Sequence, residues 1–259
     1  MYFAKALLAR TFTLSVCLLA ALLAPERGDA EPEAPYPLFV ATYDVKLNGL
    51  RVGKADFRLV REGPDQYLYQ QESVTTGVAA IFGTDSSAEQ SHWRVTESGI
   101  QPLEYLSQRE DGDDDDNAHL IFDWEKLRVK NIGAGTHWDI EMPEGTLDKM
   151  VLQLAMLIEL REGATSFAHP VAIRGRIKTY RFELVGEDRT ELGFGTYPTL
   201  KLERKDDDRD ESWIWSAPDL NYFPVRFLKK KKAGLKVELL LRDVEFRPDN
   251  PEQEAEAGS

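Results

Sequence analysis

Cysteine is almost absent from this chain. The single cysteine among its 259 residues is Cys17, which lies in an apolar run close to the start. With one cysteine, no disulfide can form within the chain, and thiol chemistry is limited to a single position. The fold must therefore be stabilised by its hydrophobic core, and a chain of this length is long enough to form one.

Long apolar runs are missing beyond the first thirty residues. The run at 11–24 is shorter than the roughly 20 residues with which a helix spans a bilayer. Lys5 and Arg10 precede the apolar stretch, and Ala30 follows it at a suitable cleavage position. This layout is typical of a secretory signal peptide, with an uncleaved anchor as the alternative. We expect removal of residues 1–30 and a mature periplasmic protein with no transmembrane anchor.

Positive charge is also scarce. The chain has 32 Lys and Arg against 45 Asp and Glu, a net charge of −13. Residues 1–30 contain three basic and two acidic residues, so their removal leaves a net charge of −14. Such a surface repels nucleic acid and anionic headgroups at long range, although a local basic or apolar contact remains possible. We therefore expect no nucleic-acid partner.

Motifs of catalysis and cofactor binding are missing too. The sequence has no Gly-x-Ser-x-Gly elbow, no Walker loop and no dinucleotide-binding glycine fingerprint. The histidines His92, His119, His137 and His169 are scattered, and none are about three to five residues apart, as zinc chelation requires. We expect no catalytic residue, metal or cofactor. A hydrolase built on a pair of carboxylates remains as the enzymatic alternative.

Three charged runs interrupt the apolar patterns. Residues 111–117 are rich in aspartate but lack the glycine and glutamate that an EF-hand loop needs at its sixth and twelfth positions. We expect this run and residues 206–208 to be solvated turns between strands. The lysine run at 229–232 is also interpreted as a hairpin turn, with binding of a phosphate or headgroup as the alternative.

Strand patterns dominate the rest of the sequence. Short alternating segments are bounded by Gly, Asp, Asn or Pro, and Asn48-Gly49 is the favoured two-residue hairpin turn. Gly53 indicates a bulge or the close approach of another backbone. We predict a mostly β fold of about a dozen antiparallel strands. Its single domain spans 39–247, after a leader at 31–38 and before a disordered acidic tail at 248–259.

One segment has a helical period instead. Apolar residues recur at helical spacing over about 146–162, and the stripe they form is wide enough to pack against the sheet. Thr146 or Asp148 is suited to the N-cap, and Gly163 to the position just after the last turn. We therefore expect one amphipathic helix to pack on the sheet.

An aromatic stretch near the end, WIWSAPDLNYFPVRFLK, predicts two strands joined by a loop. Trp213 and Trp215 share one face of the first strand, and Ile214 lies on the other. Pro218 lacks the N–H that a strand ladder needs, and Pro224 is placed at the first residue of the second strand. We expect both tryptophans to point into the interior.

With these elements in place, the chain resembles the family of exported Gram-negative envelope proteins called domain of unknown function 3108 (DUF3108). The resemblance is carried by YDVKLNGLRVGKADFRLV, by TLDKMVLQLAMLIELREG with the strands after it, and by the aromatic stretch through LLLRDVEF. Together they cover roughly residues 43–246. The resemblance implies export and a mostly β fold, a large curved antiparallel sheet or open β-barrel packed on the helix, and it supplies no catalytic residues.

Two functional hypotheses follow. In the first, the curved sheet encloses an apolar cavity that binds a lipid or other apolar ligand for maintenance of the cell envelope. The alternative for the same side chains is a solid core. In the second, the protein is a structural or assembly factor that contacts an envelope protein, with exposed aromatics at Trp138 and Tyr222-Phe223. The candidate cavity residues are Phe57, Leu59, Tyr67, Tyr69, Tyr180, Phe182, Trp213 and Trp215.

Overall fold

The structure is a computed structural model that describes residues 34–75, 86–110, 117–133, 136–206, 210–232 and 234–248. The expected signal peptide at 1–30 lies outside these ranges. So do all but the first residue of the expected tail, and most of the acidic run that starts at Asp111.

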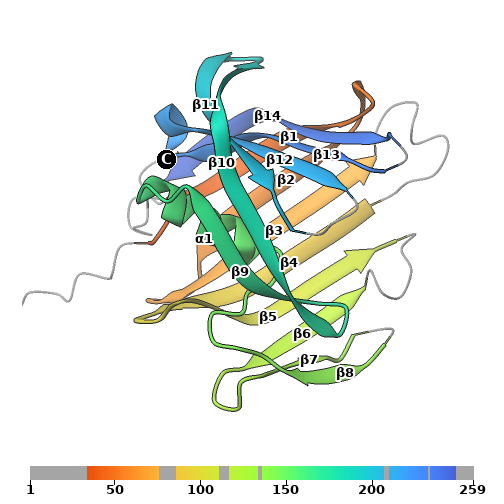
Figure 1. The fold of residues 1–259 in the computed structure, drawn as a ribbon, viewed down its shortest axis with the longest axis vertical. Helices are drawn as coiled ribbons and strands as arrows, with labels where there is room; N and C mark the ends of the chain where they lie inside the picture. Colours follow the sequence, from red (N-terminus) through yellow and green to blue (C-terminus); the bar gives the residue numbers. More distant parts are fainter. Residues whose placement is uncertain are drawn as a thin grey trace, which may run out of the picture. The chain divides into compact units, whose positions relative to one another are not determined.

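The described chain forms one antiparallel sheet of fourteen strands with one α-helix (Figure 1). This confirms the predicted mostly β fold with a large curved sheet and a helix. The strands are β1 Leu38–Leu47, β2 Leu50–Arg61, β3 Gln66–Thr75, β4 Ser86–Thr96, β5 Gly99–Arg109, β6 Ala118–Asp123, β7 Arg128–Asn131, β8 Trp138–Glu141, β9 Ser166–Ile173, β10 Arg176–Leu192, β11 Gly195–Arg204, β12 Glu211–Ala217, β13 Phe223–Lys230 and β14 Lys236–Arg247. Helix α1 spans Val151–Arg161, and a short 3-10 helix, η3, spans Pro218–Leu220.

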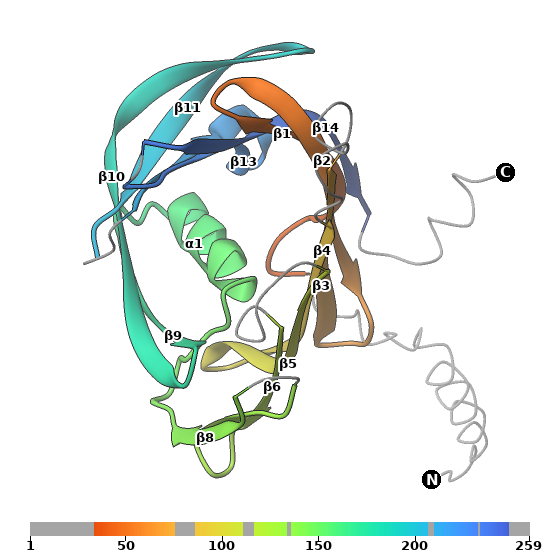
Figure 2. The ribbon, with the colours of Figure 1, turned by 90° about the vertical axis from the view of Figure 1, so that its right-hand side faces the viewer.

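The first and last strands lie in the middle of the sheet. β1 pairs with β14, and every other neighbouring pair is consecutive in the chain, so β8 and β9 form the two edges. Helix α1 connects these edge strands, and Figure 2 shows the sheet curled around it. The concave face therefore surrounds α1, which presents buried side chains to it.

The expected turn and close approach in the first hairpin are both confirmed. Asn48 and Gly49 have φ of 50° and 86°, the left-handed pair that a tight hairpin between twisted strands requires. The register of β1 and β2 shifts opposite Gly53, which marks a bulge. A Cβ at Gly53 would lie 2.4 Å from the carbonyl oxygen of Val74, so only glycine fits there.

Helix α1 begins later than the predicted 146–162. Leu147 pairs with β9 in a parallel bridge: its N–H donates to the Pro170 carbonyl at 2.8 Å, and its carbonyl accepts from Ala172 at 3.0 Å. The chain can turn into a helix only after this bridge. Asp148 acts as the cap, because its Oδ1 accepts the N–H groups of Met150 at 2.7 Å and Val151 at 2.9 Å.

The helix ends as predicted. Gly163 has a φ of 95°, the left-handed conformation that follows many helices. Its N–H donates to the carbonyl of Leu160 at 3.1 Å, and the N–H of Ala164 donates to Glu159 at 2.9 Å. These two bonds satisfy carbonyls that the last turn would otherwise leave unpaired, which defines a Schellman motif.

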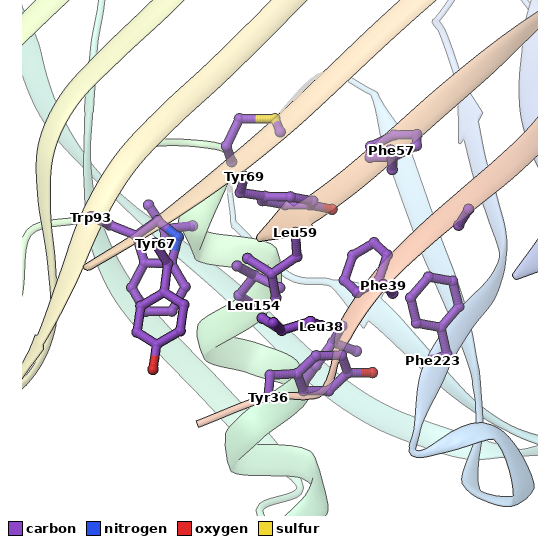
Figure 3. Close-up of a cluster of buried hydrophobic side chains, with 14 of the residues drawn as sticks. Tyr36, Leu38, Phe39, Phe57, Leu59, Tyr67, Tyr69, Trp93, Leu154 and Phe223 are labelled. Carbon is purple, nitrogen blue, oxygen red and sulfur yellow. The ribbon is translucent and has the colours of Figure 1, made fainter. Parts of the chain in front are cut away.

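A dense aromatic and aliphatic cluster fills one end of the interior (Figure 3). Trp93 of β4 is fully buried and stacks on Tyr67 of β3, with ring centroids 4.6 Å apart. Leu154 of α1 is also fully buried in this cluster. Tyr36 is buried here too, although it belongs to the expected leader at 31–38, and its hydroxyl donates to the Asn221 carbonyl at 3.0 Å.

The aromatic stretch folds as predicted into a strand, a loop and a second strand. β12 ends at Ala217, η3 carries Pro218, and β13 starts beside Pro224. Asn221 and Tyr222 take left-handed backbone conformations, with φ of 55° and 59°, and these turn the chain into β13.

Candidate functional site

An apolar cavity of about 490 Å³ lies between α1 and the concave face of the sheet. Strands β1 to β4 and β10 to β14 contribute to its walls, so segments from both halves of the chain meet around one helix. Its apolar lining consists of Tyr43, Val45, Ala55, Phe57, Tyr69, Met150, Leu152, Met156, Leu157, Tyr180, Phe182, Ile214, Pro224, Phe227, Val237 and Leu239.

Four of the eight candidate residues line this cavity. Phe57 of β2 and Tyr69 of β3 lie on one wall, and Tyr180 and Phe182 of β10 on another. The two pairs lie more than a hundred residues apart in the sequence. Residues two apart on a strand share a face, and this explains why Tyr180 and Phe182 point together into the cavity.

Two other candidates belong to the packed end of the interior. Leu59 and Tyr67 are each 1% exposed and lie within the aromatic cluster, next to Trp93 and Leu154 (Figure 3). Of the two alternatives for these side chains, the solid core applies to Leu59 and Tyr67, and the open cavity applies to Phe57 and Tyr69. The interior is solid around Trp93 and open beside Phe57.

Neither tryptophan lines the cavity, although Trp215 is buried, at 4% exposure, in the same hydrophobic cluster as Trp93, and Trp213 is half-buried against that cluster. Ile214 lines the cavity, and its neighbours Trp213 and Trp215 alternate away from it. Lys201 lies 5.6 Å and 5.2 Å from the two indole rings, and Arg226 lies 4.5 Å from that of Trp215. Alternation shows which residues share a face, but it does not show which face is concave.

A polar chamber of about 640 Å³ adjoins the apolar cavity. It lies between the two ends of the sheet, where the β9–β10 turn approaches β8: a Cβ at Gly175 would be 3.5 Å from the Trp138 ring. Four residues line both spaces, and they mark the junction between apolar and polar surface. These are Lys149, Tyr180, Arg204 and Lys229.

Asp206 organises part of this junction. Its side chain is only 2% exposed; Lys178 binds it at 2.8 Å, and Arg204 Nη2 donates to it at 2.7 Å. Burial disfavours its charge, but the hydrogen bonds from Arg204 and Lys178 prevail and hold the pKa of Asp206 below its ordinary value. The expected solvated turn at 206–208 is therefore wrong for Asp206, while residues 207 and 208 lie outside the described ranges.

A second polar cluster lies where α1 meets the sheet. Asp148 is fully buried, and Ser91 of β4 donates to its Oδ2 at 2.5 Å. Beside it, Glu89 accepts hydrogen bonds from Lys149 at 2.9 Å and from Tyr105 at 2.8 Å. Burial raises the pKa of Asp148 to about 6, since the hydrogen bonds that it accepts offset only part of its desolvation. This cluster fixes the start of α1 and therefore one wall of the cavity.

Asp148→Asn is expected to raise stability at neutral pH. In the folded protein the pKa of Asp148 is about 6, against an ordinary 3.8, so its contribution to stability falls as pH rises from about 4 to 6. Asparagine keeps the acceptor for the helix N–H groups and removes the buried charge. We expect the variant to exceed the natural protein by about 1–3 kcal/mol at pH 7, and by little near pH 4.

Urea unfolding at both pH values measures the difference in the free energy of unfolding between the variant and the natural protein. Titration of all other groups cancels in this difference, because both proteins contain them. Asp148→Ala serves as the control, because it removes the cap as well as the charge and should lose about 1 kcal/mol of capping energy at pH 4. An asparagine variant that is less stable than the natural protein at pH 7 would contradict the assignment.

The described ranges contain no helix with the length and apolar character needed to cross a membrane. In the same part of the chain, no three His, Cys, Asp or Glu side chains are grouped so that they could hold a metal ion.

The architecture defines the class of this protein as a β-barrel-like fold, a curved sheet wrapped around one helix. A solved structure described as a "Beta-barrel-like Protein of Domain of Unknown Function DUF1849 from Brucella abortus" shares this fold. The similarity has a TM-score of 0.53 at 9% identity, over 82% of this chain and 98% of that one.

The family is shown by sequence. The profile of the family described as "Protein of unknown function (DUF3108)" matches residues 42–240, most of the chain, and the chain belongs to this family. This confirms the resemblance carried by the strand and helix motifs. A comparison with curated proteins finds no match.

Proposed function

We propose that this protein is a non-enzymatic, ligand-binding protein of the periplasm that holds a lipid or other apolar molecule against α1. The supporting observation is the apolar cavity, whose 490 Å³ falls within the roughly 300–1,000 Å³ of small-molecule sites. The signal-like sequence at 1–30 supports export, and the resemblance to envelope proteins supports a role in maintaining the cell envelope.

The character of the cavity wall favours a ligand over an incidental void. Protein interiors are packed almost as densely as organic crystals, and their voids are few and small. Here Val45, Phe227 and Leu239 remain only half-buried, although they line the same space as α1. An apolar ligand would remove their surfaces from water at about 25 cal/mol per Å², which is the driving force for binding.

Titration of the delipidated protein with a fluorescent fatty acid tests the proposal. We expect saturable one-to-one binding at micromolar ligand. Ala55→Phe places a ring inside the cavity and should weaken binding at least about tenfold, since a tenfold change corresponds to only 1.4 kcal/mol. Val45→Phe does the same from a half-buried position, which guards against a folding defect in the first variant.

Ala168→Phe on β9 is the matched control, because Ala168 is exposed and does not line the cavity. It should bind like the natural protein. Absence of saturable binding at micromolar ligand would end the proposal. So would equal affinities for the Ala55, Val45 and Ala168 variants, since ligand would then be binding elsewhere.

The second candidate, an envelope assembly factor, draws support from exposed apolar residues at two hairpins. Leu50 is 75% exposed beside the β1–β2 turn, and Phe194 is 45% exposed at the β10–β11 turn. The aromatics expected to be exposed are not: Phe223 is buried, and Trp138 and Tyr222 are half-buried. Crosslinking from position 50 in intact cells should trap a defined partner, and recovery of uncrosslinked monomer alone would count against this candidate.

A further inference from the structure

Cationic side chains predominate over acidic ones among the described residues that line the polar chamber. One lining residue, Asp210, is acidic, while the chain as a whole has a net charge of −13. Six of the described lining residues are cationic, and Glu89, Asp206 and Asp210 form ion pairs with four of them. These cations are Lys149, Arg174, Arg176, Lys178, Arg204 and Lys229.

Three of these cations also border the apolar cavity. Lys149 precedes α1, Arg204 ends β11 and Lys229 lies in β13, so the fold gathers them from distant parts of the sequence. Arg204 is held in place by Asp206, and its guanidinium lies 4.1 Å from the centre of the Tyr180 ring. Charge and apolar surface therefore meet along one border.

The two lysines at this border are accessible to an entering anion. The side chain of Lys149 is 41% exposed and pairs with Glu89 at 2.9 Å. That of Lys229 is 35% exposed and pairs with Asp210 at 3.2 Å. Each Nζ carries three donors, so one carboxylate partner leaves donors for a second acceptor.

We propose that the ligand of the cavity is an anionic amphiphile, with its apolar chain against α1 and its headgroup among Lys149, Arg204 and Lys229. This inference rests on the proposed binding function and adds the chemical class of the ligand. The acidic surface repels anions at long range, but beyond a screening length of about 8–10 Å that repulsion is weak. At the border, an anion meets the lysine donors that a single carboxylate partner leaves open, beside a low-dielectric wall where attraction is stronger than in water.

The test compares a fluorescent fatty acid with its methyl ester, which has the same chain and no charge. The natural protein should bind the acid at least about fivefold more tightly, a conservative fraction of what a hydrogen bond to a charged group contributes. Lys229→Gln should remove most of this preference, because it weakens binding of the acid far more than binding of the ester. Raising the salt to ~1 M, where the screening length is about 3 Å, should shrink the preference in the natural protein.

Lys230→Gln is the matched control. Lys230 is adjacent in β13, is similarly exposed and also makes one ion pair, with Glu211 at 2.8 Å, yet it does not line either space. It should keep the full preference for the acid. Equal binding of acid and ester, unaffected by Lys229→Gln, would overturn the anionic assignment and leave the apolar site intact. Binding of neither probe would instead overturn the proposed function itself.

The anionic group could be the carboxylate of a fatty acid or the phosphate of a lysophospholipid. A competition experiment against the bound probe distinguishes the carboxylate from the phosphate. The competitors are an unlabelled fatty acid, a lysophosphatidic acid and a neutral monoacylglycerol of equal chain length. Stronger displacement by either anion than by the neutral lipid supports the assignment and identifies the source. Stronger displacement by the monoacylglycerol contradicts it.

Discussion

Replacing Trp93 with alanine is expected to lower the free energy of unfolding by about 3–5 kcal/mol, the usual cost of deleting a fully buried large aromatic side chain. Trp93 is 0% exposed, pairs with Tyr67 across β3 and β4, and stacks on its ring at an interplanar angle of 21°. The cluster around it closes one end of the sheet over α1, so the void could not be filled by a small shift of neighbours. Urea denaturation at equilibrium measures the loss.

Trp213→Ala is the matched control, because Trp213 is half-buried on the outer face of the sheet, near Lys201. It should cost about 1 kcal/mol, close to the typical effect of a single substitution. Equal losses at the two positions would contradict the division of the molecule into a packed interior and an outer aromatic face.

Leu154→Ala is expected to cost about 4 kcal/mol and Leu157→Ala about 2 kcal/mol, both within the range of about 2–5 kcal/mol for buried leucines. Both lie on α1, are almost fully buried and belong to the packed cluster, but Leu157 also lines the open cavity and Leu154 does not. Truncation in the packed region creates a new void and loses dispersion contacts on every side. Beside an existing cavity, fewer contacts are lost.

Paired denaturation of the two variants isolates this effect, because residue type, helix and substitution are the same. Leu157→Ala should still bind the fluorescent fatty acid, since it enlarges the site that the ligand occupies. A Leu157 variant that loses as much stability as the Leu154 variant would indicate that the cavity is filled in solution, and the binding proposal would lose its basis.

Local patterns in the sequence predicted much of this fold. The Asn48-Gly49 turn, the constraint at Gly53 and the glycine end of the helix follow from backbone sterics, which depend on few neighbours. The alternating strands and the one helical period predicted the elements and their class. The family resemblance added the barrel-like curvature that periodicity cannot supply.

The remaining features depend on pairing between distant segments. The β1–β14 pair, which brings the first and last strands together, is formed by residues about two hundred positions apart, and alternation within a strand does not choose its partner. The bridge from Leu147 to Val171 delays the start of α1 for the same reason. Asp206 is buried because Lys178 from another strand pairs with it, and the run of acidic residues in the sequence predicted a solvated turn instead.

The sequence contains an indication of how β12 is oriented, but it can be recognised only when the strand pairing is known. Lys201 and Arg226 lie opposite Trp215 on the neighbouring strands, so the face that the two indoles share also carries cations. Without the register of β11 to β13, the sequence does not show which face of β12 turns away from the cavity. The cavity itself required the full structure, because Phe57 and Phe182 face the same space from strands far apart in the sheet.

The most direct test of the account is a crystal structure of the protein with a fatty acid that carries bromine on its terminal carbon. Anomalous scattering locates the bromine without assumptions about the ligand. We predict one strong peak inside the cavity, between Phe57, Phe182 and Met156 of α1, with the carboxylate at the border formed by Lys149 and Lys229. Protein side chains filling that space, with bromine only on the outer surface, would contradict the account.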